Sequence, residues 1–192
     1  MSQLLLLLLS LFTSPKVTPT PIPIPTPIIQ TLLPPSPDFT SRVTKKTFGT
    51  YVNPRNSPVS PEVFTGYHSA LDIEYPDILD DLPITAVAEG KIIYSGIVSG
   101  YGGFVAQQIF IENVPYIATY GHLRPSTMVK AGTVLKAGES VGLLGTGYTP
   151  ETDNERRHLH FAILKGTKLD FRGYVQKQSE LSLWLNPLTL YP

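Results

Sequence analysis

Cysteine is absent from this 192-residue chain. Its absence excludes disulfide bonds, thiolate metal ligands, a cysteine nucleophile and a lipid attached through cysteine. The cellular compartment stays open, because a chain without cysteine simply makes no use of an oxidising environment. The length allows one sizeable folded domain with a short accessory segment.

An excess of positive charge is also missing. Lysine and arginine together number 15, as do aspartate and glutamate, so the formal net charge is zero. Nucleic-acid binding usually leaves a basic excess in the sequence, because the binding surface must neutralise phosphates. We therefore expect no nucleic-acid partner.

The apolar run at the N-terminus is too short to span a membrane. It extends from Leu4 to Phe12, whereas a membrane-spanning helix needs about 20 residues. Its length matches the hydrophobic centre of a secretory signal, although a positively charged leader and a small-residue cleavage site are missing. We expect residues 1–13 to direct export or to attach the chain to a membrane, which places the protein in the cell envelope or outside the cell. The alternative is a frayed terminus.

Proline recurs at nearly every second position between Ser14 and Asp38. Because proline lacks a backbone N–H, such a segment cannot form a regular helix or sheet. We expect residues 14–38 to be a disordered, extended spacer that holds the domain away from its attachment point. A proline-rich ligand for a recognition module is the competing interpretation, but basic residues that often accompany such ligands are nearly absent.

Helical periodicity is scarce after Phe39, except around QSELSLWLNP. Short β-branched and aromatic runs alternate instead with Gly, Asn and Pro, which is typical of strands and turns. We predict that residues 39–192 form one all-β domain, a compact antiparallel sheet or sandwich. The glycines of VKAGTVLKAGESVGLLG indicate tight hairpins. Lys136 in this stretch lacks the flanking residues of a biotinyl or lipoyl carrier, so a swinging-arm function is not expected.

Histidine is rare, and two of the four histidines flank a single leucine in RRHLHFAIL. On a strand, alternate side chains point to opposite faces. Leu159, Phe161 and Ile163 should therefore face the core, while His158 and His160 line a cleft on the other face.

The other two histidines lie in GYHSALDIEY and TYGHLRP. His68 and Asp72 are four residues apart, and a histidine with a carboxylate is a common ligand pair for zinc. Such a pair alone is more often a surface ion pair. His122 alone indicates no more than a polar residue at the end of a strand.

Together, these motifs resemble the zinc metallopeptidases of the M23 family, the LytM or lysostaphin type of peptidoglycan endopeptidase. The resemblance follows the order FTGYHSALDIEY, ITAVAEGKIIYSG, SGYGGFV, YGHL, VKAGTVLKAGESVGLLGTG and RHLHFAI. It covers roughly residues 43–188. Two positions depart from the family pattern: Ala70 stands where glycine is common, and FVAQQIFIEN lacks a histidine that this strand usually carries.

The resemblance implies an active-site groove with one zinc ion held by His68, Asp72 and His160. It assigns catalysis to His122 and His158. Three protein ligands leave a fourth tetrahedral position for water, which distinguishes a catalytic zinc site from a structural one. The implied function is hydrolysis of the peptide part of bacterial cell-wall peptidoglycan, at a cross-bridge or a stem peptide.

The same residues are compatible with other functions and roles. The main alternative is a non-catalytic LytM-like module that binds or activates another cell-wall hydrolase, although such modules usually lose zinc ligands; a plain wall-binding domain would use none of the five site residues. The charged insert TPETDNERR before His158 is either a groove wall or a solvated loop. Tyr67 and Tyr120 lie beside site residues in the sequence. They either supply an extra hydroxyl donor or are aromatic residues that line the groove or pack in the core.

Overall fold

The computed structural model of the chain describes residues 32–191. The predictions for residues 1–13 and for residues 14–31 of the proline-rich segment lie outside this range. Within it, no helix has the length and apolar character needed to cross a membrane.

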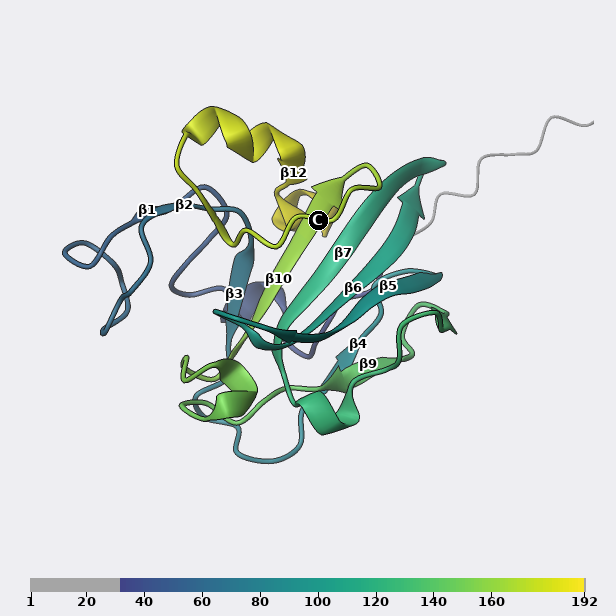
Figure 1. Ribbon diagram of the computed structural model, residues 1–192, viewed down its shortest axis with the longest axis horizontal. Coiled ribbons are helices and arrows are strands. Elements are labelled where there is room, and N and C mark those ends of the chain that lie inside the picture. Colours follow the sequence, from purple (N-terminus) through teal and green to yellow (C-terminus); the bar gives the residue numbers. More distant parts are fainter. Residues whose placement is uncertain (1–31, 192) are drawn as a thin grey trace, which may run out of the picture.

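The described residues form a nearly all-β domain, which confirms the predicted fold class (Figure 1). Its strands are β1 Tyr51–Val52, β2 Gly66–His68, β3 Leu71–Glu74, β4 Pro83–Thr85, β5 Gly90–Val98, β6 Gly102–Ile111, β7 Val114–Leu123, β8 Val134–Leu135, β9 Ser140–Leu143, β10 His158–Lys165, β11 Tyr174–Val175 and β12 Trp184–Leu185. Helical residues occur as short 3-10 turns: η1 Thr40–Arg42, η2 Pro125–Thr127, η3 Pro150–Thr152, η4 Gln178–Leu183 and η5 Pro187–Leu190. The weak helical signal of QSELSLWLNP corresponds to η4.

A seven-stranded antiparallel sheet forms the centre of the domain, in the order β12-β10-β7-β6-β5-β8 with β3 also paired to β10. One edge of β10 pairs with β7. The other edge pairs first with β3 and then with β12. Strand β10, which carries the HLH motif, is therefore held on both sides, and β3 lies beside it in Figure 1.

Two smaller sheets complete the fold, β1-β2-β11 and β4-β9. The glycine-rich stretch that indicated tight hairpins forms β8 and β9, but these strands do not pair with each other. Strand β8 pairs with β5, and β9 pairs with β4. The turn glycines thus redirect the chain from one sheet to another, because each strand finds its partner far away in the sequence.

The main core lies against one face of β10. Leu159, Phe161 and Ile163 are fully buried in it, as their alternation predicts. On the opposite face, Ala162 and Leu164 join a second buried cluster. Both faces of β10 are therefore covered, and only its first residues, with the two histidines, border a cavity.

The last part of the proline-rich segment packs onto the domain instead of forming a free spacer. Leu32 is buried in the main core. The backbone N–H of Leu33 donates to Val87 O at 2.8 Å, and that of Thr85 donates to Pro35 O at 2.9 Å. Proline itself cannot donate, but its carbonyl can accept, which allows this attachment. The folded part therefore begins before Phe39, where we predicted its start.

Candidate metal centre and catalytic histidines

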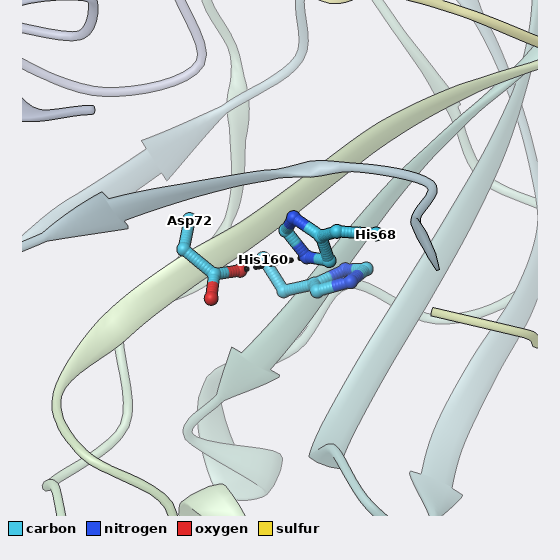
Figure 2. A group of neighbouring side chains, drawn as sticks. All are labelled: His68, Asp72 and His160. Carbon is cyan, nitrogen blue, oxygen red and sulfur yellow. Dashed lines mark ion pairs between the residues drawn. The ribbon is translucent and has the colours of Figure 1, made fainter. Parts of the chain in front are cut away.

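The structure brings His68, Asp72 and His160 together (Figure 2). In the pairing of β3 with β10, Asp72 lies directly opposite His160. Directly opposed residues on adjacent strands have neighbouring side chains. His68 ends β2, and the two-residue connection to β3 turns its side chain towards the other two.

The three side chains are suited to hold a metal ion. One potential ligand atom from each lies within 4.8 Å of the others, and all three residues are buried. His68 Nε2 and Asp72 Oδ1 are 3.2 Å apart. Two ligands of a tetrahedral zinc at about 2.0–2.1 Å lie about 3.3 Å from each other, so this spacing fits a shared ion.

Their hydrogen bonding points to the same conclusion. Within residues 32–191, no hydrogen-bond partner is found for His68 Nε2, Asp72 Oδ1 or either ring nitrogen of His160. Buried polar atoms without a partner are rare and costly, and each requires an explanation. A bound cation would satisfy them, and two imidazoles with one carboxylate form a donor set that zinc accepts.

Three of the histidines direct a nitrogen towards backbone carbonyl oxygens. Nδ1 of His68 lies 3.3 Å from Thr47 O, Nδ1 of His122 lies 3.2 Å from Thr152 O, and Nδ1 of His158 lies 2.8 Å from Arg156 O. A carbonyl can only accept, so Nδ1 carries the proton in the neutral ring and Nε2 has the free lone pair. This arrangement leaves Nε2 available in all three rings.

A β-bulge places His122 at the cavity. The register of β6 with β7 shifts between Gly103 and Phe104, so that His122 has no partner in that pairing. Its φ of 63° lies in the left-handed region, which is uncommon for residues other than glycine. Bulges commonly redirect a side chain beside an active site, and the YGHL motif does not reveal this one.

His122 and His158 form a close pair of neutral rings. Their centroids are 4.2 Å apart, and both side chains are buried. Burial lowers the pKa of His122 to about 4 and lowers the pKa of His158 well below its usual value. Two positive rings at this distance would repel each other, so we infer that the pair carries at most one positive charge near neutral pH.

Arg156 carries a permanent positive charge beside Asp72. Burial raises the pKa of Asp72, but the combined effect of His158, His68 and Arg156 is larger and opposite. The pKa of Asp72 therefore lies well below its usual value. His158 is itself neutral at pH 7, whereas the guanidinium of Arg156 is permanently charged, and its Nη2 lies 2.6 Å from Asp72 Oδ2. Asp72 is therefore a carboxylate, the form that binds metal.

A cavity of about 290 Å³ opens beside these residues. It is bordered by Asp72, His160 and both histidines of the close pair, and also by Lys46, Phe64, Thr65, Ser99, Gly100, Tyr101, Glu155, Arg156, Phe171, Gly173, Tyr174 and Gln176. Of the two interpretations of the TPETDNERR insert, the groove wall is the one observed, because Glu155 and Arg156 line the cavity.

The tyrosines at the cavity are not those singled out in the sequence. Tyr120 is in the core, where its hydroxyl contacts Gln107 Oε1 at 3.0 Å. Tyr67 packs against Tyr51. The lining tyrosines are Tyr101 and Tyr174, which come from distant turns and strands that only the folded chain brings together.

The family comparison agrees with this geometry. Residues 66–171, more than half of the chain, match the model of peptidase family M23. The chain belongs to this family of peptidases. Among curated proteins, none matches the sequence.

Solved structures show the same fold at low sequence identity. The structure of cbpa from L. salivarius REN is 20% identical, covers 83% of this chain and 94% of its own, and has a TM-score of 0.55. The structure of LytU is 24% identical, and the match covers 76% of this chain and 81% of the LytU chain, with a TM-score of 0.50. A chain of the SpoIIQ–SpoIIIAH pore-forming complex is 18% identical, and the match covers 84% of this chain and 91% of that one, with a TM-score of 0.56.

Proposed function

We propose that this protein is a zinc-dependent endopeptidase that hydrolyses peptide bonds of bacterial cell-wall peptidoglycan. The observation that carries the proposal is the convergence of three buried side chains beside a pair of neutral histidines. Within residues 32–191, the nitrogen and oxygen atoms that these three side chains offer to an ion have no hydrogen-bond partner. Family membership supports peptide hydrolysis. The cell-wall substrate rests on the resemblance of the motifs to LytM and lysostaphin-type enzymes.

In this proposal, His68, Asp72 and His160 hold the zinc ion. When bound, zinc supplies a Lewis acid that activates water and polarises a peptide carbonyl. The cavity of about 290 Å³ is near the lower end of the roughly 300–1,000 Å³ typical of ligand sites. It has room for the peptide group that is cleaved and its flanking atoms, while the rest of the substrate extends beyond it.

In this proposal, His122 and His158 transfer the proton from the attacking water to the leaving amine. Both are neutral at pH 7 with Nε2 unprotonated, so either can accept a proton from the attacking water. The ring that accepts this proton on Nε2 becomes positively charged, and the same proton is then available to the leaving amine. The carbonyl oxygens of Thr152 and Arg156 keep the two rings oriented through Nδ1.

Export of the protein belongs to the same proposal. A wall hydrolase must reach the outside of the membrane, and the apolar run between Leu4 and Phe12 suits a secretory or attachment segment. We propose that the protein acts in the cell envelope or outside the cell.

Digestion of purified peptidoglycan tests the function. Fragments are analysed by mass spectrometry after incubation with the protein, with the protein plus a chelator, and with the chelated protein after zinc is restored. We expect cleavage of peptide bonds in the first and third samples only. Hydrolysis that is unaffected by zinc depletion contradicts the mechanism, whereas wall binding without zinc and without cleavage supports the non-catalytic module instead.

A further inference from the structure

A buried arginine lies behind the candidate metal ligand Asp72. Arg156 is 8% exposed. Its Nη2 donates to Asp72 Oδ2 at 2.6 Å and to Glu74 Oε1 at 2.7 Å, and its Nε donates to both oxygens of Glu74 at 3.0 and 3.1 Å. Burying a guanidinium is costly unless carboxylates compensate it, and β3 supplies two of them.

The two oxygens of Asp72 have different surroundings. Oδ2 accepts the short hydrogen bond from Arg156 and lies 3.5 Å from His158 Nε2. Oδ1 has no hydrogen bond within the described residues and faces His68 Nε2 at 3.2 Å. The terminal torsion of aspartate is broad and roughly two-fold. Without the arginine, either oxygen or both could therefore turn towards the metal position.

We propose that Arg156 is a positioning residue of the metal centre. Its guanidinium holds Oδ2 of Asp72, so that Oδ1 alone is presented to the ion shared with His68 and His160. This inference rests on the proposed function, because it takes the three-residue cluster to be the zinc site.

Glu74 makes the arrangement compatible with a cation. A guanidinium next to a metal ligand repels a positive ion, and Glu74 offsets that charge by accepting hydrogen bonds from Nε and Nη2 of Arg156. The orientation of Asp72 is kept while the repulsion is reduced. Asp72, Arg156 and Glu74 together carry one negative charge, the same as an isolated aspartate ligand.

The arginine also contacts the close histidine pair. Its carbonyl oxygen lies 2.8 Å from Nδ1 of His158. The side chain of Arg156 thus orients a ligand, and its backbone orients the neighbouring histidine. A side-chain substitution changes the first contact and leaves the backbone carbonyl in place, so the two effects can be separated.

The zinc affinity of the full-length protein tests the positioning role. Zinc is titrated into metal-free protein in competition with a chromophoric chelator. Arg156→Lys keeps the positive charge but removes the planar fork that reaches both carboxylates. We expect zinc binding to weaken by about 10–100-fold, the usual effect of losing a group that orients a metal ligand. Arg157→Lys is the matched control, because the side chain of Arg157 donates to Asp80 O on the surface. The zinc affinity of this variant should equal that of the unmodified protein.

Two further measurements separate positioning from general stability. Glu74→Gln removes one of the two β3 carboxylates that compensate the guanidinium, so the uncompensated charge should also weaken zinc binding. This variant tests the proposal if Arg156→Lys does not fold. The absorption spectrum of the cobalt-substituted protein should change in Arg156→Lys, because Asp72 is free to bind through both oxygens, and should not change in Arg157→Lys. Folded variants with unaltered zinc affinity and cobalt spectrum, whatever their resistance to urea, overturn the proposal.

These outcomes are distinct from a failure of the proposed function. If the unmodified protein binds zinc but releases no peptidoglycan fragments, hydrolysis is wrong while the role of Arg156 is judged on affinity alone. If zinc-dependent cleavage is found and Arg156→Lys binds zinc as tightly as the unmodified protein, only the positioning role is wrong. An unmodified protein that binds no zinc overturns both.

Discussion

The four histidines of this chain differ in what their nitrogen atoms contact. His68, His122 and His158 each direct Nδ1 to a backbone carbonyl, which fixes the tautomer. Neither ring nitrogen of His160 finds such a partner within the described residues. Its ring packs against His68 and Tyr101. Residue type alone therefore does not define a role, since the local backbone decides which nitrogen is available.

Substitution of the two histidines of the HLH motif should give different results. We expect His160→Ala to lose zinc and activity together, because a histidine and a carboxylate alone rarely hold zinc tightly. His158→Ala should retain zinc while the rate of peptide hydrolysis falls by about 10²–10⁴, the usual contribution of a positioned acid or base. Bound zinc is measured by elemental analysis after dialysis, alongside the hydrolysis rate.

The same two variants can also show that the assignment is wrong. Zinc loss from His158→Ala with retention in His160→Ala would mean that the two roles are exchanged. Unchanged zinc content and rate in both variants would mean that the histidines are polar residues of a strand with no part in catalysis.

At the level of the elements, the site depends on close packing around β7. Gly121 lies opposite His160 in the pairing of β7 with β10. A Cβ atom at this position would be 2.6 Å from Cδ1 of Tyr101 and 3.3 Å from Cβ of His160. The strand cannot move away easily, because it is paired with β6 on one side and β10 on the other. The glycine of YGHL thus allows Tyr101 and His160 to pack against the strand.

Gly121→Ala should disturb both stability and activity. We expect a loss of about 1–3 kcal/mol in the free energy of unfolding, typical of overpacking, together with a lower hydrolysis rate as Tyr101 and His160 shift. Urea unfolding and a rate assay measure the two effects. Gly96→Ala is the control, because a Cβ there meets mainly the hydroxyl end of Tyr94, which can move. Equal effects of the two substitutions would contradict the packing argument.

The sequence predicts the direction of side chains along a strand better than it predicts which strands meet. Alternation in RRHLHFAIL places Leu159 in the core and His160 at the cavity, as the structure shows. The pairing of His160 with Asp72 joins residues 88 positions apart, by subtraction of their numbers. No local pattern encodes that register, so the cluster was inferred from a family resemblance.

The features that sequence reasoning missed have physical reasons of the same kind. The bulge at His122 depends on how β6 pairs with β7. The role of Arg156 depends on two carboxylates of β3, and in the sequence it was one charge among several in an insert. Residues 32–38 are attached through buried Leu32, the N–H of Leu33 and the carbonyl oxygen of Pro35, whereas the prediction of a free spacer considers only the N–H that proline lacks.

For the whole molecule, the buried histidines couple stability to pH. Burial lowers the pKa of His122 to about 4 and holds the pKa values of His158 and His160 well below the usual value near 6.5. Below pH 6.5 the unfolded chain takes up protons at these residues, while the metal-free folded chain does not. Acidification from pH 6.5 towards 4 therefore favours unfolding.

The metal-free protein should lose stability steeply in this pH range. Each histidine contributes up to about 1.4 kcal/mol per pH unit to the free energy of unfolding. Urea titrations in the presence of a chelator at pH 7, 6 and 5 measure the loss. His122→Gln removes one of these groups and should reduce the slope. A urea midpoint that stays constant from pH 7 to pH 5 would show that the histidines are protonated in the folded state.

The distance along the chain between Asp72 and His160 has a consequence for a protein without cysteine. In the proposed site, one ion links Asp72 to His160, which are 88 residues apart (160 − 72 = 88). A disulfide bond would make such a link in a chain that contains cysteine. By analogy with disulfide loops, such a link is worth on the order of 4–5 kcal/mol. Bound metal stabilises a folded chain in proportion to the logarithm of its free concentration. If the site binds zinc as proposed, the zinc supply in the surroundings would thus govern how large a fraction of the molecules stays folded, and loss of the metal would lower stability as well as activity.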